Sequence, residues 1–283
     1  MRLSLVVLTC ERPDALELVL RGVARQRVAP FEVIVTEDGA AAGTRACVEA
    51  ARPGFPAPLL HLTQARHGRG ACRARNRGVA AARGDYVVFL DGDMVPGPDF
   101  VADHRAFARR GCFAQGSRVL LPEARTRALL AARRLDVPFL AAGLERRRHL
   151  VRAPRLRDLW GRPHQRRDGV KSCNFAFWRD DLVALNGFEE RLRGWGLEDA
   201  ELAQRAFHLG LRRRDLRMGA VALHLWHPPS VLQDDNPNWV TLREVERSGR
   251  TRAVRGLADH LAEGGGRREA GSQGAAAAGD ALR

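Results

Sequence analysis

Short apolar runs alternate with amphipathic segments along the first 120 residues of the chain. After Pro13, apolar side chains recur at i, i+3, i+4 and i+7, which predicts a helix packed against a sheet. The run at residues 86–90 is apolar throughout, as in a strand that is buried on both faces. Strands that alternate with helices predict βαβ units around a mostly parallel sheet, and hence an α/β fold. The predicted strands of this half are residues 3–8, 31–36, 59–62 and 86–90, and its helices begin at Pro13 and Ala71.

The hydrophobic pattern is less regular in the second half of the chain. Residues 145–169 contain nine arginines and no sustained period, so we expect a mobile loop or an irregular excursion there. Residues 263–283 are rich in glycine, alanine and charge, which predicts a disordered tail after a single domain over residues 1–262. The other predicted elements are helices at 98–109, 124–134, 180–185 and 198–209, and strands at 113–121, 171–178 and 221–225.

Composition narrows the class of protein. The 283 residues are 45% hydrophobic and 28% charged, which is typical of a globular protein. The apolar opening ends at Cys10, too early for a signal peptide, and no window approaches the roughly 20 apolar residues that span a bilayer. The five cysteines form no CxxC pair, and we expect them to be buried thiols in a reducing cytoplasm.

The net charge of +14 raises the possibility of binding to nucleic acid. Lys171 is the only lysine among 47 basic residues, a usage that indicates arginine spread over the whole surface rather than a binding patch. We therefore expect no nucleic-acid partner, and a non-catalytic protein that binds nucleic acid or an anionic surface remains the alternative. The arginines of residues 146–167 could close over a phosphate group, contact an anionic membrane, or be solvated surface.

Two common nucleotide-binding motifs are absent. Gly68 and Gly70 begin a G-x-G-x-x-G pattern, but Arg73 stands where the third glycine belongs, which argues against a dinucleotide-binding oxidoreductase. Lys171 precedes Ser172 without the upstream glycine loop of a P-loop NTPase.

Three carboxylates follow predicted strands. Asp38 comes after one strand, and Asp91 and Asp93 come after another. Ligands of open α/β sheets bind at the carboxyl ends of the strands, where we expect these acids to gather. Asp-x-Asp at such a place is suited to Mg²⁺ or Mn²⁺ with a nucleoside diphosphate, although Asp-Gly is also common in simple turns.

A glycine-rich loop with a tryptophan precedes the helix predicted at residues 198–209. Gly194, Trp195 and Gly196 make a tight, exposed loop, and Glu198 and Asp199 then open the helix. An exposed tryptophan beside a carboxylate is suited to stacking on a sugar and reaching its hydroxyl. The simpler alternative is that the acids stabilise the helix start.

The order of these motifs resembles the inverting glycosyltransferases of family 2. The segments are V-V-L-T at 6–9, T-E-D-G at 36–39, A-R-N-R-G at 74–78, G-D-Y-V-V-F-L-D-G-D at 84–93 and N-G-F-E-E at 186–190. G-W-G-L-E-D at 194–199 and H-L-W-H-P at 224–228 resemble the half shared with β-1,4-galactosyltransferases and chondroitin-polymerase-type enzymes. The resemblance implies a GT-A fold, with a nucleotide-sugar-binding half at 1–120 and an acceptor-binding half at 121–262.

The resemblance also implies roles for the donor side of the site. Thr9 and Asp38 would line the nucleoside pocket, with Asp38 toward the uracil. Arg75 and Asn76 would lie near the donor, and Asp91 would face the ribose, the sugar and the metal. Metal ligands would be Asp93 and His227, with His224 as the weaker candidate.

On the acceptor side, the resemblance implies that Asp199 is the base. Glu198 would hydrogen-bond the acceptor or hold the loop of Gly194 and Gly196, and Trp195 would stack on the acceptor sugar. The family commonly carries a second glycine where Leu197 stands, so this loop departs from the family pattern.

We therefore expect a metal-dependent enzyme that uses Mn²⁺ or Mg²⁺. It would move a hexose or N-acetylhexosamine from a UDP-sugar to a hydroxyl of a glycan or lipid-linked acceptor, with inversion. The expected location is the cytoplasm, with possible peripheral contact at the inner face of the membrane.

Overall fold

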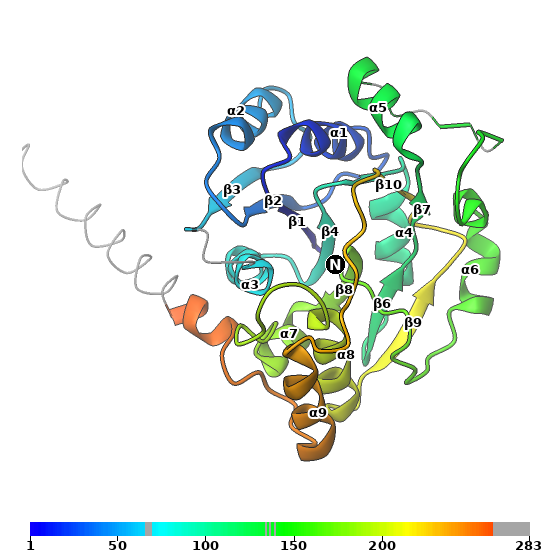
Figure 1. Cartoon of the computed structure of the whole chain (residues 1–283). Coiled ribbons are helices and arrows are strands. Elements are labelled where there is room, and N and C mark those ends of the chain that lie inside the picture. The colour runs from blue at the N-terminus through cyan, green and yellow to red at the C-terminus, as the bar shows by residue number, and fades with distance from the viewer. Residues whose placement is uncertain (66–69, 134, 136, 139, 263–283) are drawn as a thin grey trace, which may run out of the picture.

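A seven-stranded sheet forms the centre of the molecule, in the order β3-β2-β1-β4-β8-β6-β9 (Figure 1). The computed structural model describes residues 1–65, 70–133, 135, 137–138 and 140–262. The strands are β1 (Leu3–Thr9), β2 (Glu32–Glu37), β3 (Leu59–Thr63), β4 (Tyr86–Asp91), β6 (Cys112–Gly116), β8 (Asn174–Trp178) and β9 (Arg212–Leu216). The helices are α1 (Pro13–Ala24), α2 (Ala42–Ala51), α3 (Ala71–Ala81), α4 (Phe100–Phe107), α5 (Glu123–Ala132), α6 (Pro154–Trp160), α7 (Arg179–Leu185), α8 (Glu198–His208) and α9 (Asn238–Ser248), with a 3-10 helix, η1 (Arg147–Leu150).

The direction of the strands confirms a mostly parallel sheet with one reversed strand. The strands β3, β2, β1 and β4 run parallel, β8 is antiparallel to both β4 and β6, and β9 is parallel to β6. The strand order changes direction between β1 and β4, because β2 and β3 continue on one side and β4 on the other. In open α/β sheets, ligands bind at this switch point, beside the carboxyl ends of the strands.

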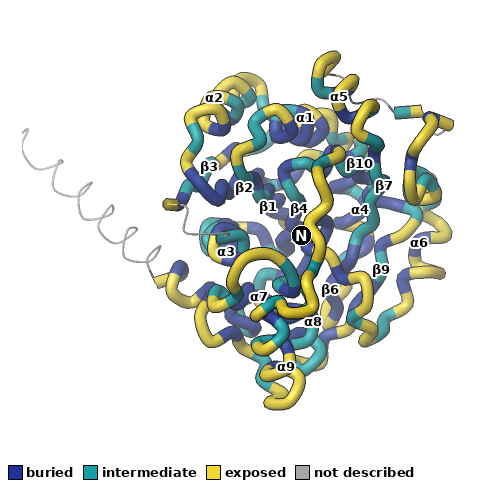
Figure 2. Tube along the Cα trace, viewed as in Figure 1, coloured by how far each residue is buried: buried dark blue, intermediate teal, exposed yellow. Residues whose placement is uncertain are grey.

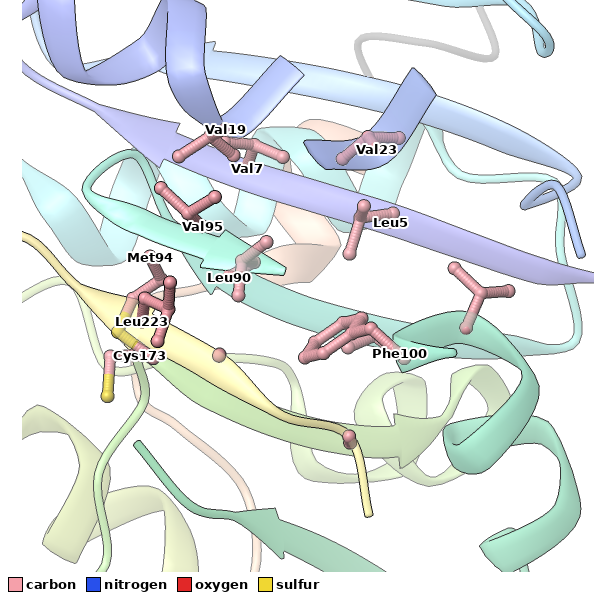
Figure 3. Close-up of a cluster of buried hydrophobic side chains, with 14 of the residues drawn as sticks. Leu5, Val7, Val19, Val23, Leu90, Met94, Val95, Phe100, Cys173 and Leu223 are labelled. Carbon is pink, nitrogen blue, oxygen red and sulfur yellow. The ribbon is translucent and has the colours of Figure 1, made fainter. Parts of the chain in front are cut away.

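Both faces of the sheet are covered, because successive residues of a strand point to opposite sides. In β1, Leu5 and Val7 join a core beneath α1, α2 and α4, whereas Val6 joins a core with α3, α7 and α8. The buried strands between exposed helix surfaces are visible in Figure 2. Figure 3 shows the first core, where Val19 and Val23 of α1 lie over Leu5 and Val7. This two-sided burial explains why the apolar runs of the sequence are continuous.

A second, three-stranded sheet lies beside the carboxyl end of β4. It contains β5 (Met94–Pro96), β10 (Ala222–His224) and β7 (Val119–Leu120), in the order β5-β10-β7. β10 is antiparallel to β5 and parallel to β7. The small sheet thus joins the end of β4 to the C-terminal half of the chain.

Several predicted elements differ from the observed ones. The strand predicted at 113–121 is divided into β6 and β7, which belong to different sheets, and the strand predicted at 171–178 starts only at Asn174. The stretch predicted to be irregular, 145–169, contains η1 and α6. The pattern also missed α2, α9, β5 and β9. The predicted tail at 263–283 lies outside the described residues.

The prediction of five buried cysteines is wrong for two of them. Cys72, Cys112 and Cys173 are buried, whereas Cys10 and Cys47 are partly exposed. None of the helices over the described residues is long and apolar enough to cross a membrane.

A fully buried ion pair joins α8 to the turn that follows α7. Arg205 donates to both carboxylate oxygens of Glu201, at 2.8 and 2.7 Å, and to the carbonyls of Leu185 and Gly187. Both side chains of the pair have no exposed surface. The pair holds α8 against this turn. Removal of either partner would leave the other charge buried and unpaired, which is costly in free energy.

We expect Arg205→Met to lower the free energy of unfolding by about 3–5 kcal/mol, because Glu201 is left buried and unpaired. Arg21→Met is the control, because it breaks a half-exposed ion pair with Glu17 on the same helix. It should change the free energy of unfolding by less than about 1 kcal/mol. Urea unfolding followed by circular dichroism measures both values. Equal losses in the two variants would contradict the importance of the buried pair.

Candidate active site

The turn after β4 brings its two aspartates to the switch point of the main sheet. Asp91 is paired with Leu8 of β1, and the amide of Gly92 donates to the carbonyl of Leu8 at 2.6 Å. The chain then enters β5, where Met94 is paired with His224 of β10. The second sheet therefore sets Asp93 beside His224.

Asp93, His224 and His227 form a group that could hold a metal ion. Their ligand atoms all lie within 4.8 Å of one another, and Asp93 Oδ2 is 3.7 Å from His224 Nε2 and 3.5 Å from His227 Nε2. His227 Nδ1 donates to the carbonyl of Pro228 at 2.9 Å, which leaves Nε2 as the free acceptor. His224, the weaker candidate by sequence, is thus as well placed as His227.

The electrostatics of this group also fit a cation. Asp93 Oδ1 is buried and has no hydrogen-bond partner within the described structure. Burial, reinforced by the negative charge of Asp91, raises the pKa of Asp93 to about 6. Burial, reinforced by Arg118, lowers the pKa of His224 to about 3. A divalent cation would reverse the shift of Asp93, because it favours the charged carboxylate, and it would agree with the shift of His224, because it binds the neutral imidazole.

Arg75 joins the end of β4 to the start of α8. Its side chain is almost fully buried, its Nη2 donates to Asp91 at 2.9 Å, and its Nη1 lies 3.7 Å from Glu198. Burial opposes the charge of the guanidinium, but Asp91 and Glu198 outweigh it and raise the pKa of Arg75. The arginine therefore stays charged and holds the two carboxylates in a fixed relation.

Asn76, the neighbour of Arg75, is turned away from the site. Its side chain is completely buried, accepts from the amide of Phe188 and donates to the carbonyl of Phe188 and to Glu190, each at 2.8 Å. A Cβ on Gly187, which has a φ of +65°, would lie 2.2 Å from Asn76 Oδ1. Asn76 thus anchors α3 to the loop after α7 and does not line the cavities described below.

The predicted loop of Gly194, Trp195 and Gly196 is held by polar contacts. Glu198 accepts from the amide of Gly196 at 3.1 Å, and Asn238 of α9 donates to the carbonyl of Gly196 at 2.9 Å. Leu197 has a φ of +72°, a left-handed conformation that glycine adopts without strain. Leu197 therefore stands where both the family pattern and the backbone conformation favour glycine.

Asp199 is partly buried at the start of α8, beside Glu198. Its Oδ1 accepts from the amide of Ala200 at 2.8 Å. Burial and the charge of Glu198 raise the pKa of Asp199 to about 6, against a smaller opposing effect of Lys171. A carboxylate in this state is ionised at neutral pH and is more basic than an ordinary aspartate.

Two adjoining cavities contain these groups. The histidine cavity, of about 630 Å³, is lined by Asp93, His224 and His227, and the acid cavity, of about 450 Å³, is lined by Arg75, Glu198 and Asp199. Both cavities are also lined by Asp91, Arg118 and Trp195. A separate cleft of about 690 Å³, lined mainly by α1 and α2, includes none of these residues.

Two predicted nucleoside residues lie outside both cavities. Asp38 accepts from Gln64 at 3.0 Å and from the amide of Gly70 at 2.7 Å, and so ties the end of β2 to the start of α3. Thr9 is buried, and its hydroxyl has no hydrogen-bond partner among the described residues. The amide of Asp38 donates to the carbonyl of Thr9 at 3.0 Å, so the two residues are adjacent.

Sequence reasoning missed several residues of the cavity walls. Arg118 lines both cavities, and Lys171 and Trp239 line the acid cavity. Arg118 had no distinguishing signal among so many arginines. Lys171 had one, since it is the only lysine of the chain.

Two family profiles cover most of the described chain. The profile described as Glycosyl transferase family 2 matches residues 4–162, and that described as the N-terminal domain of galactosyltransferase matches residues 160–227. Chondroitin synthase of Pasteurella multocida (strain Pm70) is 25% identical over 252 residues, which are 82% of this chain and 26% of that protein. Validoxylamine A glucosyltransferase of Streptomyces hygroscopicus subsp. limoneus is 29% identical over 231 residues, or 74% of this chain and 48% of that protein. The chain thus spans less than half the length of either of these relatives.

Solved structures share the fold at low sequence identity. S. aureus TarS 1-349 in complex with UDP-GlcNAc has a TM-score of 0.62 and 17% identity, over 93% of this chain and 71% of that chain. GalNAc-T7 with UDP, GalNAc and Mn²⁺ has a TM-score of 0.61 and 14% identity, over 86% of this chain and 48% of that chain. These likenesses confirm the predicted GT-A fold.

We expect Mn²⁺ to raise the Tm of the protein by about 3–6 °C at a hundred times its Kd, since the ion binds only the folded chain. The shift should vanish in Asp93→Asn and in the double variant His224→Ala, His227→Ala. His149→Ala, which removes a partly buried histidine outside the group, should retain it. Differential scanning fluorimetry gives the result, and a full shift in the double variant would rule out this ligand set.

Proposed function

The chain belongs to glycosyl transferase family 2, and on that premise we propose that it is an inverting, metal-dependent glycosyltransferase. It moves a hexose or N-acetylhexosamine from a UDP-sugar to a hydroxyl of a glycan or lipid-linked acceptor. One observation carries the proposal: a group suited to a cation and a carboxylate suited to a base line two cavities that meet at Asp91, Arg118 and Trp195. The three buried thiols, Cys72, Cys112 and Cys173, support a reducing, cytoplasmic setting.

On the donor side, the residues would bind the nucleoside diphosphate. Asp38 would accept the N3 proton of uracil, and Thr9, whose hydroxyl has no hydrogen-bond partner in the described part of the chain, would contribute a second polar contact. Asp93, His224 and His227 would hold a divalent ion that neutralises the charge on the leaving diphosphate. Two imidazoles with one carboxylate favour Mn²⁺ over Mg²⁺, because nitrogen ligands suit the transition metals better.

On the acceptor side, Asp199 would act as the general base. It takes the proton of the acceptor hydroxyl while that oxygen forms a bond to the anomeric carbon. The bond from the anomeric carbon to the diphosphate breaks, and the nucleoside diphosphate leaves with the electron pair. Attack from the side opposite the leaving group inverts the anomeric centre. Base assistance of this kind is worth about 10² to 10⁴ in rate.

The neighbouring groups keep that base in place and in the right state. Glu198 holds the loop that carries Trp195, and its charge makes Asp199 more basic. Arg75, in the wall of the acid cavity, pairs with both Asp91 and Glu198, and so would keep the sugar side and the acceptor side of the site at a fixed distance. Trp195, with 38% of its surface exposed, offers an indole face on which an acceptor sugar can stack.

The pKa of Asp199 predicts the pH dependence of the reaction. Only the ionised carboxylate accepts a proton, so kcat should fall about tenfold per pH unit below about pH 6. Glu198→Gln removes a like charge and should lower the pKa of Asp199, moving this limb of the profile to lower pH. A profile that is flat down to pH 5 in the wild-type enzyme would exclude Asp199 as the base.

Substitution of the base should act on the chemical step. We expect Asp199→Asn to lower kcat by at least about 10² with donor affinity nearly unchanged. Asp180→Asn, at the exposed start of α7, is the matched control and should retain full activity. UDP release with both substrates varied gives kcat and KM, and near wild-type kcat in Asp199→Asn would refute the assignment.

The nucleotide preference tests the role of Asp38. In the presence of Mn²⁺, UDP should raise the Tm of the wild-type protein more than GDP does, and Asp38→Asn should lose most of this preference. Asp14→Asn, an exposed acid at the start of α1, should keep it. Stronger stabilisation by GDP would show that the donor carries a different base.

A further inference from the structure

A small basic recess opens beside the acid cavity. It has a volume of about 220 Å³ and is lined from the ends of β6 and β9 and from the residues around η1. Arg118, Asp168 and Lys171 line both the recess and the acid cavity. Of the residues that line the histidine cavity, only Arg118 reaches the recess. The recess therefore adjoins the acid cavity, which contains the candidate base, and includes none of the candidate metal ligands. Its basic side chains are Arg118, Arg146, Lys171, Arg213 and Arg217.

The recess has more positive charge than its own acidic side chains neutralise. Asp215 is already bound by Arg213 at 2.8 Å and by Arg217 at 3.4 Å. Over the described residues, no ion pair within 4 Å engages Arg118, Arg146 or Lys171. Arg118 Nε is buried and lacks a hydrogen-bond partner among these residues. The single remaining acid in the lining, Asp168, cannot neutralise three cations.

The titration of His149 agrees with this surplus. Burial, reinforced by the charges of Arg148, Arg217 and Arg146, lowers the pKa of His149 to about 4. The imidazole is thus held neutral by its burial and by the positive charge around it. A group that compensates such a field must be an anion.

We propose that this recess binds an oxyanion of the acceptor, a carboxylate or a phosphate, so that the enzyme glycosylates a negatively charged acceptor. The inference rests on the proposed function. An acceptor anchored there by its charge would present its hydroxyl to Asp199, because Lys171 lines both spaces and acts electrostatically on Asp199. Charge-assisted hydrogen bonds from arginine fix the orientation of such groups. The donor diphosphate is the weaker occupant, since the recess contains none of Asp91, Asp93, His224 and His227.

The only lysine of the chain makes direct observation of the recess possible. Acylation with an amine-selective acetylating reagent can modify Lys171 and the N-terminal amine alone, and mass spectrometry follows both rates. A hexuronate-terminated oligosaccharide and a sugar phosphate should each be compared with the matched neutral hexose oligosaccharide. We expect at least one of the two anions to slow acylation of Lys171 by about tenfold or more while the N-terminal amine reacts at its normal rate. The anion that protects identifies the source of the charge.

Variants separate this inference from the proposed function. Arg146→Gln, Arg217→Gln removes two charges that line only the recess, and Arg45→Gln on α2, beside the opposite edge of the sheet, is the matched control. The double variant should keep the UDP thermal shift and the slow hydrolysis of UDP-sugar by water. It should lose the protection of Lys171 and at least about tenfold in kcat/KM for the anionic acceptor, with the neutral one unaffected.

Two outcomes would overturn the inference. The first is equal protection of Lys171 by the neutral oligosaccharide, or no protection by either anion at millimolar concentration. The second is a double variant that still distinguishes anionic from neutral acceptors as the wild type does. Failure of the wild-type protein to bind UDP or to hydrolyse UDP-sugar is a different result, because it counts against the proposed function itself.

Discussion

The guanidinium of Arg205 has no contact with solvent, and its N–H groups bind both oxygens of Glu201 and the carbonyls of Leu185 and Gly187. These bonds fix the turn after α7 on α8. Asn76 of α3 binds the next residue of the same loop, Phe188. The two helices that carry Arg75 and Asp199 are therefore held to one another through a single buried loop. The geometry of the site depends on this connection, because a guanidinium without these partners is unstable in the interior.

The charges of the site are divided between its two sides. Asp93 and Asp199 are both less acidic than ordinary aspartates because they are partly withdrawn from water and lie beside another carboxylate. Arg75 and Lys171 compensate this charge around the acid cavity, whereas the histidine cavity contains a group that could hold a cation. In the proposed function, this division would help to place the donor and its metal ion in the histidine cavity and the acceptor in the acid cavity.

The parts of the structure that depend on local pattern could be predicted, and those that depend on distant contacts could not. The strands β1, β2 and β4 are largely apolar because both faces are buried, and the end of β4 marks Asp91 and Asp93. The pattern alone left a simple turn as the alternative there, and the metal role came from the family resemblance. His224 is as well placed as His227 to bind a metal because β10 pairs with β5, and this contact joins residues that are far apart in the sequence. Asn76 could be linked to a motif, but only the folded loop shows that its amide binds Phe188 rather than a ligand.

The strand β9 could not be predicted for a different reason, and that reason affects which arginines of this protein can be substituted. Its sequence, RRRDL, has no hydrophobic period, because its arginines bond internally: Arg214 donates to the carbonyls of Gly161 and Phe107 and lies over the Phe107 ring at 3.9 Å. Arg213 likewise donates to the carbonyls of Arg166 and Asp168. Arg214 bonds its two carbonyls from two separate nitrogens, Nε and Nη1, of one planar group, whereas a lysine has a single nitrogen and no planar face to lie over the ring. Exchanging arginine for lysine to adjust solubility or codon usage would thus be neutral at exposed sites and would loosen the interior at these, although net charge is the same in both cases.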